Sequence, residues 1–368
     1  MARIRNPFTP TFGMVPPFMA GRDRLLDQMA EAFEDGMGNP NLSTILVGAR
    51  GTGKTALLSC IADEAQSRGW IAVNTVAAPG MLEDIVQQTG KSAAHIIEPK
   101  QDRRLSGIGL GQLLNLEWVF EDGAAANWRS RMDALIDKLA QHDVGLLITV
   151  DEVRVEVEEM IQLVSTYQLF VREGKKVSLV MAGLPMNVTD LVDDERITFL
   201  RRARQQHLGR ISDPEIRRAF RKTVENAGKT IADNALDLTV AASGGFAYMM
   251  QLVGYFTWAE SDTSKEITEQ HAKAGIAQAQ DDFRRGVLEA TYREMSEGDR
   301  AFALAMLPDD HGSKLSDVAK RMGKRTNYAS TYKTRLLKQG VIEEQTGNTF
   351  DFAIPFLREY LSEMDAGQ

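Results

Sequence analysis

The residues with the clearest chemistry form one short stretch, Gly48-Ala49-Arg50-Gly51-Thr52-Gly53-Lys54-Thr55. The stretch fits the pattern G-x-x-x-x-G-K-[ST], in which glycines let consecutive backbone N–H groups curl around a phosphate. Lys54 would reach the β- and γ-phosphate oxygens, and the Thr55 hydroxyl would bind Mg²⁺. The predicted nucleotide-binding residues are Gly48, Ala49, Arg50, Gly51, Thr52, Gly53, Lys54, Thr55 and Ala56.

Two neighbouring acids, Asp151 and Glu152, form the second candidate group. They end a continuous apolar run, 144–150, which is typical of a strand buried on both faces of a parallel sheet. Open α/β sheets bind ligands at the carboxyl ends of their strands. We therefore expect Asp151 to hold Mg²⁺ through water and Glu152 to polarise the attacking water. Acids that merely favour a following helix N-terminus are the alternative, which the upstream phosphate-binding pattern disfavours.

Arginines in the segment 197–204 form the third candidate group. Arg201 or Arg202 could reach the γ-phosphate bound to a neighbouring subunit and stabilise charge in the transition state. A solvated helical face is the other interpretation of the same residues, and the sequence does not decide between them.

The elements that must position these groups follow from the hydrophobic pattern. Apolar runs predict buried strands at 44–47, 69–76, 144–152 and 176–185. Amphipathic segments between the runs predict helices, so the fold class is α/β with the parallel sheet of a P-loop NTPase. Partial alternation with glycines at 105–118 predicts a β-hairpin within an insertion at about 79–123. The hairpin is either a structural element or a surface for partners or DNA.

The chain after about residue 211 changes character twice. Helical patterns fill 211–297, and the first helix begins at Ser212-Asp213-Pro214-Glu215, where Ser212 or Asp213 can cap. In 298–368, three short helices, the second capped by Ser316, precede two short strands around Gln345-Thr346-Gly347-Asn348. This order predicts a winged helix.

The third of these short helices is rich in cations, although the formal net charge of the chain is −8. Local basicity in an acidic chain indicates a nucleic-acid contact, and the third helix would enter the major groove. The candidate DNA-binding residues are Lys324, Arg325, Asn327, Tyr328, Thr331, Lys333, Arg335 and Lys338.

Composition sets the broad class. The 368 residues are 43% hydrophobic and 26% charged, which is ordinary for a soluble globular protein of two or three domains. No run of about 18 uncharged apolar residues occurs, so we expect no membrane span. The N-terminus has no apolar signal region, and Cys60 is the only cysteine, so we expect a reducing cytoplasm. Residues 1–20 contain four prolines and should run extended across the surface.

Read in order, these segments resemble AAA+ ATPases of the origin-recognition/Cdc-like and STAND-type clade. The resemblance rests on Gly21-Arg22, on 48–55 as Walker A, on 146–152 as Walker B, and on the helical segment and winged helix. Arg5-Asn6-Pro7-Phe8-Thr9-Pro10, Ala20-Gly21-Arg22-Asp23 and Ala182-Gly183-Leu184-Pro185 look like a bacterial, actinobacterial-style group of these ATPases. The implied division is an arm at 1–20, an ATPase domain at 21–210, a helical lid at 211–297 and a winged helix at 298–368.

The resemblance also implies site residues and cofactors. Gly21 and Arg22 match the segment beside the adenine, Arg201 or Arg202 matches the arginine finger, and the cofactors are ATP and Mg²⁺. Two departures matter. Ala182 and Gly183, with Asn187 nearby, stand at sensor one, and Ser243-Gly244-Gly245-Phe246-Ala247-Tyr248 carries no arginine at sensor two. Losing both groups would weaken stabilisation on the γ-phosphate side, so we expect slow hydrolysis.

Two functions remain open at this point. The first is an ATP-binding switch with slow Mg²⁺-dependent hydrolysis, which couples nucleotide state to self-association and to double-stranded DNA through the winged helix. The second is a STAND-like signalling ATPase whose winged helix contacts protein instead of DNA. A metabolic P-loop kinase is disfavoured, because a lid and a winged helix supply no evident small-substrate pocket. No membrane partner is expected.

Overall fold

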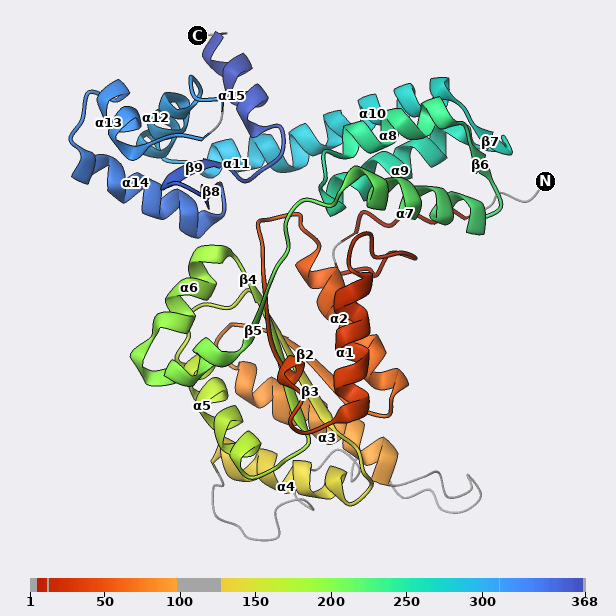
Figure 1. Ribbon diagram of the computed structural model, residues 1–368, viewed down its shortest axis with the longest axis vertical. Helices are drawn as coiled ribbons and strands as arrows, with labels where there is room; N and C mark the ends of the chain where they lie inside the picture. The colour runs from red at the N-terminus through yellow and green to blue at the C-terminus, as the bar shows by residue number, and fades with distance from the viewer. Residues whose placement is uncertain (1–4, 12, 98–126, 311, 367–368) are drawn as a thin grey trace, which may run out of the picture.

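The computed structural model describes residues 5–11, 13–97, 127–310 and 312–366. The predicted hairpin at 105–118 lies outside these residues. Figure 1 shows an α/β unit in the lower part of the view and two helical units above it, joined by one long helical segment. Among the described residues, no helix is both long enough and apolar enough to cross a membrane.

A five-stranded parallel sheet forms the centre of the lower unit. Its strands are β1 (Ser43–Val47), β2 (Ile71–Val76), β3 (Leu146–Asp151), β4 (Val177–Gly183) and β5 (Arg204–His207). Their order is β2-β3-β4-β1-β5, and every neighbouring pair is parallel. The α/β class and four of the strands agree with the sequence prediction. β5 was not predicted, because Arg-Gln-Gln-His at an exposed sheet edge carries no hydrophobic signal.

Helices cover both faces of this sheet. Leu46, Leu147 and Val180 point to one face, where they pack with α1 (Asp23–Asp35) and α2 (Lys54–Ser67). Their strand neighbours, including Ile45, Ile148 and Leu179, pack on the other face. That face is covered by α3 (Met81–Ile97), α4 (Trp128–Ala140) and α5 (Glu158–Arg172). Burial on both faces is the reason these strands read as continuous apolar runs.

Shorter elements complete the lower unit. A 3₁₀ turn, η1 (Pro40–Leu42), precedes β1. Between β4 and β5 lie α6 (Pro185–Asp193) and the 3₁₀ segment η3 (Glu195–Arg202). The last of these contains Arg201 and Arg202, so both candidate arginines lie directly before the edge strand.

The first helical unit contains α7 (Asp213–Asn226), α8 (Asp233–Ser243), α9 (Ala247–Ser261) and α10 (Glu269–Phe283). Two short parallel strands, β6 (Thr230–Ile231) and β7 (Glu266–Ile267), lie at one end of it. Ser212 caps α7 as predicted, and its backbone N–H donates to the Glu215 carboxylate at 3.1 Å. A π-helical turn, η4 (Arg284–Leu288), then continues α10 into α11 (Glu289–Glu294).

The second helical unit contains α12 (Glu297–Met306), α13 (Leu315–Arg321) and α14 (Thr326–Gln339). An antiparallel hairpin follows, β8 (Ile342–Gln345) with β9 (Thr349–Phe352), and then α15 (Leu357–Ala366). The prediction that Ser316 caps α13 was wrong. Lys314 is the extended residue before that helix, so Ser316 lies inside its first turn.

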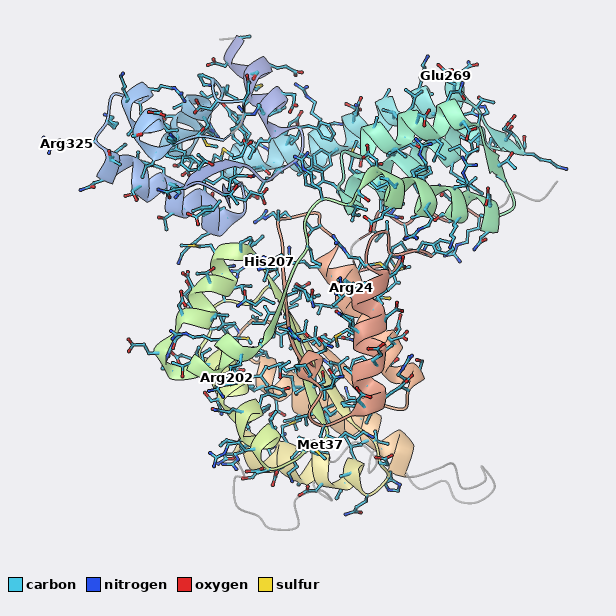
Figure 2. The ribbon with its side chains drawn as sticks, in the orientation of Figure 1. Arg24, Met37, Arg202, His207, Glu269 and Arg325 are labelled. Atoms are coloured by element: carbon cyan, nitrogen blue, oxygen red, sulfur yellow. The ribbon has the colours of Figure 1, made fainter. Side chains whose placement is uncertain are left out.

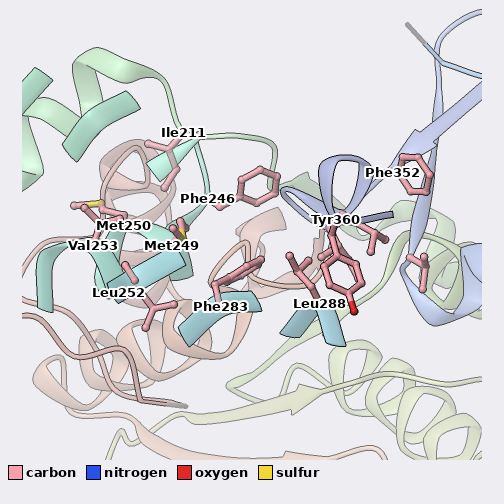
Figure 3. Close-up of a cluster of buried hydrophobic side chains, with 14 of the residues drawn as sticks. Ile211, Phe246, Met249, Met250, Leu252, Val253, Phe283, Leu288, Phe352 and Tyr360 are labelled. Atoms are coloured by element: carbon pink, nitrogen blue, oxygen red, sulfur yellow. The ribbon is translucent and has the colours of Figure 1, made fainter. Parts of the chain in front are cut away.

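One buried cluster connects the two helical units. It includes Ile211 and Phe246 from the first unit, and Phe352 and Tyr360 from the second (Figure 3). The Phe283 and Phe356 rings also meet across the junction, with centroids 6.1 Å apart. The two units therefore share a core, although the sequence suggested a division near residue 297.

The N-terminal arm, residues 5–11 and 13–20, contains no helix or strand. Most of it lies at the surface, as its prolines predicted. Phe8 does not, since its side chain is only 2% exposed and belongs to the cluster of the helical units.

Candidate active site

The loop 48–53 joins the end of β1 to the start of α2. Gly51 and Gly53 have φ angles of +79° and +87°, a region that glycine adopts without steric cost. Lys54 is the first residue of α2, so the loop lies at a helix N-terminus, where backbone N–H groups and the helix dipole favour anions. This backbone fits a phosphate group.

Close packing holds the loop in this shape. A Cβ atom on Gly48 would lie 2.8 Å from the Thr52 hydroxyl and 3.1 Å from Leu208, which leaves no room for a side chain. The Thr52 hydroxyl donates to the Ala49 carbonyl at 2.9 Å. The loop is therefore fixed by contacts that only glycine permits at position 48.

The Lys54 ammonium lies inside the loop. It donates to the carbonyl oxygens of Gly48 and Ala49, both at 2.8 Å. Burial lowers the pKa of Lys54 to about 8; Asp151 and Glu152 oppose this shift, whereas Arg50 adds to it. A phosphate oxygen would supply a negative charge beside this partly buried cation.

Thr55 and Asp151 meet at the carboxyl end of the sheet. The Thr55 hydroxyl donates to Asp151 Oδ2 at 2.6 Å, and the backbone N–H of Glu152 donates to Asp151 Oδ1 at 2.8 Å. A hydroxyl and a carboxylate are ligands that Mg²⁺ accepts while it keeps several waters. The donor set at this point fits Mg²⁺, and it joins the two motifs that the sequence suggested should meet.

Glu152 has an unusual backbone. Its φ angle is +52°, which is uncommon for a residue other than glycine. Its exposed carboxylate lies 3.4 Å from the Arg154 guanidinium. Sequence reasoning missed Arg154, because nothing in the spacing of Asp-Glu-Val-Arg shows that the chain turns back at the second acid.

The first turn of α9 lies against the phosphate loop. The backbone N–H of Tyr248 donates to the Gly51 carbonyl at 3.2 Å, and a Cβ atom on Gly53 would lie 3.3 Å from that of Ala247. The family resemblance placed the second sensor in this segment, and that assignment stays a prediction. In this chain the Arg210 guanidinium, from the segment after β5, lies 4.9 Å from the centre of the Phe246 ring.

The tip of β4 lies beside the start of the loop. The backbone N–H of Gly48 donates to the Gly183 carbonyl at 3.3 Å, and a Cβ atom on Gly183 would lie 2.6 Å from Val153. Ala182 and Gly183 carry no polar side chain, and Asn187 lies in the first turn of α6. The assignment of Ala182 and Gly183 to sensor one stays a prediction.

Gly21 and Arg22 connect the start of α1 to the helical unit. Gly21 has a φ angle of +67°, and a Cβ atom there would lie 2.9 Å from the Glu215 carboxylate. Arg22 donates to the Gly209 carbonyl at 3.1 Å. Burial lowers the pKa of Arg22, and Glu215 opposes that shift. A role beside the adenine stays a prediction.

Arg201 and Arg202 do not reach the loop of their own chain. They precede β5, whose first residue pairs with Thr44 near the start of β1, whereas the phosphate loop follows the end of β1. Figure 2 shows Arg202 well below His207, which ends β5 opposite Val47. Arg202 lines a pocket of ≈ 200 Å³ between α5, β4 and η3. A contact between Arg202 and a nucleotide bound to another subunit stays a prediction.

The candidate DNA-binding residues divide into two groups. Lys333 pairs with Glu344 at 2.9 Å, Arg335 with Asp299 at 2.8 Å, and Lys338 with Asp190 of α6 at 2.8 Å. The remaining five are exposed at the start of α14, where Arg325 points away from the molecule in Figure 2. These are Lys324, Arg325, Asn327, Tyr328 and Thr331. Acids from other elements pair with the cations in the second half of α14, and a DNA-binding role for these eight residues stays a prediction.

Two family models match the sequence. Residues 19–166 match an AAA ATPase domain, and residues 285–361 match a domain of unknown function, DUF8462. No curated protein matches. The first match covers β1 to β3 with both motifs and supports ATP hydrolysis as the activity of this chain.

Solved structures show the same fold. The Walker-type ATPase paby2304 of Pyrococcus abyssi has a TM-score of 0.62 at 14% identity, covering 94% of this chain and 96% of its own. The Aeropyrum pernix ORC2 protein, in ADPNP–ADP complexes, has 0.59 at 12%, covering 96% and 97%. Cdc6p from Pyrobaculum aerophilum has 0.51 at 14%, covering 99% of both chains. The chain therefore has an AAA+ P-loop ATPase fold similar to Cdc6 and ORC proteins.

Proposed function

We propose that this chain is an ATP-dependent switch in which hydrolysis is slow and Mg²⁺-dependent. The contact between Thr55 and Asp151 carries the proposal, because it joins the phosphate-loop helix to the acidic strand end at a place suited to Mg²⁺. The ORC2 structure holds ADPNP and ADP, which supports nucleotide binding by the same fold. Bare sensor positions support the low rate.

Each residue has a separate task in this proposal. Backbone N–H groups of the loop and Lys54 bind the phosphates of the ATP substrate, and Thr55 and Asp151 would hold Mg²⁺, which neutralises phosphate charge. Glu152 accepts a proton from the water that attacks the γ-phosphorus, while the bond to the bridging oxygen breaks. The exposed carboxylate of Glu152 must leave Arg154 before it can do so.

We further propose that α12 to α14 and the β8–β9 hairpin form a winged helix that contacts double-stranded DNA. The exposed group at the start of α14 supports this, since it combines two cations, polar side chains and a tyrosine that is 44% exposed. The division into an arm, an ATPase domain, a lid and a winged helix at residues 20, 210 and 297 belongs to the same proposal.

Titration of duplex DNA at several salt concentrations tests the DNA contact. We expect the double change Lys324→Ala and Arg325→Ala to weaken binding for all sequences and to lower the salt slope by about 2, because each lost phosphate contact releases about one counterion fewer. Lys265→Ala, at an exposed lysine near β7, is the matched control. Wild-type binding that is absent, or that stays constant between about 50 and 200 mM salt, would contradict DNA contact.

A STAND-like signalling ATPase is the second candidate, and one observation favours it. The end of α14 lies on the ATPase unit, where Lys338 pairs with Asp190, and a Cβ atom on Gly340 would lie 2.9 Å from Leu184. Leu184 directly follows Gly183, which accepts the hydrogen bond from the phosphate loop. A winged helix held in this way could transmit the nucleotide state of the ATPase unit to a protein partner.

A further inference from the structure

We propose that Phe8 is a positioning residue that anchors the N-terminal arm to the lid and thereby slows release of the bound nucleotide. The lid here means α7 to α10, and the arm means residues 5–11 and 13–20. The inference rests on the proposed binding of nucleotide at the loop 48–53, and it assigns a task to a segment outside both motifs.

The anchor is the aromatic ring of Phe8, which packs between α7 and α9 of the lid. Phe8 is 2% exposed and lies against Phe220 of α7, with ring centroids 4.8 Å apart. Its other neighbour is Gly254 in the middle of α9. A Cβ atom on Gly254 would lie 2.2 Å from Phe8 Cδ1, so only glycine admits the ring at this point.

Hydrogen bonds to α9 hold the arm on both sides of the ring. The Asn6 side-chain amide donates to the Tyr255 carbonyl at 2.9 Å. The backbone N–H of Thr9 donates to the Gln251 side chain at 3.0 Å. The arm is therefore attached to one lid helix by a buried ring and two polar contacts.

The arm then crosses from the lid to the phosphate-loop helix. The Ser59 hydroxyl of α2 donates to the Gly13 carbonyl at 3.4 Å. A Cβ atom on Gly13 would lie 3.9 Å from the Thr55 methyl group, one turn before Ser59. The arm thus passes the methyl side of Thr55, whose hydroxyl would hold Mg²⁺, and leaves Thr55 itself exposed.

The two ends of this crossing differ in strength. Near the phosphate loop a long hydrogen bond joins the arm to α2, whereas a buried ring attaches it to α9. The first turn of α9 also contacts the loop through Tyr248 and Gly51. When α9 leaves the loop, the arm leaves with it, so nucleotide release requires both contacts to open together. An arm that is not anchored can leave α2 while the lid is still closed, which removes the coupling between the two contacts.

The rate of nucleotide release tests this inference. A fluorescent ADP analogue is bound to the full chain with Mg²⁺ and displaced by excess unlabelled ADP. We expect Gly254→Ala, which changes no arm residue, to raise the release rate roughly tenfold with little effect on association, since such losses fall mainly on dissociation. Gly286→Ala is the matched control, because a Cβ atom there has no neighbour within 4 Å. It should release nucleotide at the wild-type rate.

Phe8→Ala should give the same increase, and the double variant should release no faster than Phe8→Ala alone, because both changes break one contact. Phe8→Leu, which keeps an apolar side chain, should release nucleotide more slowly than Phe8→Ala, and Phe8→Ala covers the case in which Gly254→Ala does not fold. A wild-type release rate in folded Phe8→Ala would overturn the inference while nucleotide binding stands. A wild-type chain that binds no nucleotide would overturn the proposed function and this inference with it.

Discussion

Lys54 is a partly buried cation whose ammonium donates to two carbonyl oxygens of its own loop. Its pKa falls from an ordinary 10.5 to about 8, chiefly through burial. A charge in this position is costly until an anion arrives, so the loop is prepared for phosphate at the expense of its own stability. The lowered pKa is therefore caused by Lys54 and the groups that directly surround it.

Nucleotide affinity should therefore depend on pH above neutrality. Phosphate binds protonated Lys54, so the dissociation constant should rise by up to tenfold per pH unit above about 8. Titration of nucleotide between about pH 7 and 9.5 measures this. Lys54→Arg, whose guanidinium stays charged, should bind with a nearly constant affinity over the same window. An equal pH dependence in both proteins would show that another group titrates.

Stability should change in the opposite direction. The folded pKa of Lys54 lies below the unfolded value, so the unfolded chain binds more protons between about pH 8 and 10.5. The contribution of Lys54 to the free energy of unfolding therefore rises over that window and is lost as the pH falls through about 8. If Lys54 titrates, nucleotide binding weakens over this pH window while the contribution of Lys54 to the free energy of unfolding rises. General alkaline unfolding would instead lower both affinity and stability.

The sequence predicted the positions of site residues only where those residues lie close together in the chain or at the end of an apolar run. The 48–55 pattern placed Lys54 and Thr55 in the loop, and the apolar run ending at Asp151 correctly suggested a meeting with it. Phe8 could not be predicted in the same way. Its partner Gly254 is far away in the chain, and a glycine in a helix does not reveal which ring it admits.

At the scale of elements, the hydrophobic periodicity of the sequence identified the buried strands and missed the exposed one. Four strands were predicted, of which β1, β3 and β4 are largely buried on both faces, whereas the polar edge strand β5 was not predicted. α14 shows the same limit, since its cations read as one face until Glu344, Asp299 and Asp190 are placed beside them. Charge pairing across elements depends on tertiary structure and leaves no local pattern.

The docking of α14 on α6 leads to a prediction at this scale. Lys338→Glu places a carboxylate beside Asp190 and Glu156, so the end of α14 should separate from α6. Hydrogen exchange of amides in α6 should become faster, while Tm falls by less than about 4 °C, because a partly exposed ion pair contributes about 0.2–1 kcal/mol. Asp190→Lys in the same chain should restore slow exchange. Unchanged exchange in Lys338→Glu would show that the apolar contact of Leu184 suffices.

At the scale of the whole molecule, the described residues at the two expected sensor positions include no arginine. Arg201 and Arg202 lie near the opposite end of the sheet from their own loop, so we expect them to act between chains. ATPase activity per chain should then rise with protein concentration. Because the strand that follows these arginines was not predicted, the sequence could not show which end of the sheet they occupy.

Mixing two inactive variants tests this assembly. Lys54→Ala removes ATP binding and keeps the arginines, whereas Arg201→Ala with Arg202→Ala keeps the loop and removes them. Each variant alone should hydrolyse slowly, and a mixture should recover part of the wild-type rate, because one chain supplies the site and the other the arginine. The arginine variant must bind ATP with wild-type affinity as a control. No recovery in the mixture would argue that the arginines act within their own chain or not at all.

The core shared by the two helical units has a practical consequence for dissecting the chain. The match to DUF8462 begins at residue 285, inside the π-helical turn η4 (Arg284–Leu288). A fragment cut there would lose Ile211, Phe246 and Phe283, which bury the apolar side chains around Leu288 and Tyr360. The exposed surface would favour aggregation over independent folding. A fragment that starts before Ile211 keeps both halves of that core, so the natural folding unit is larger than the sequence family that marks its end.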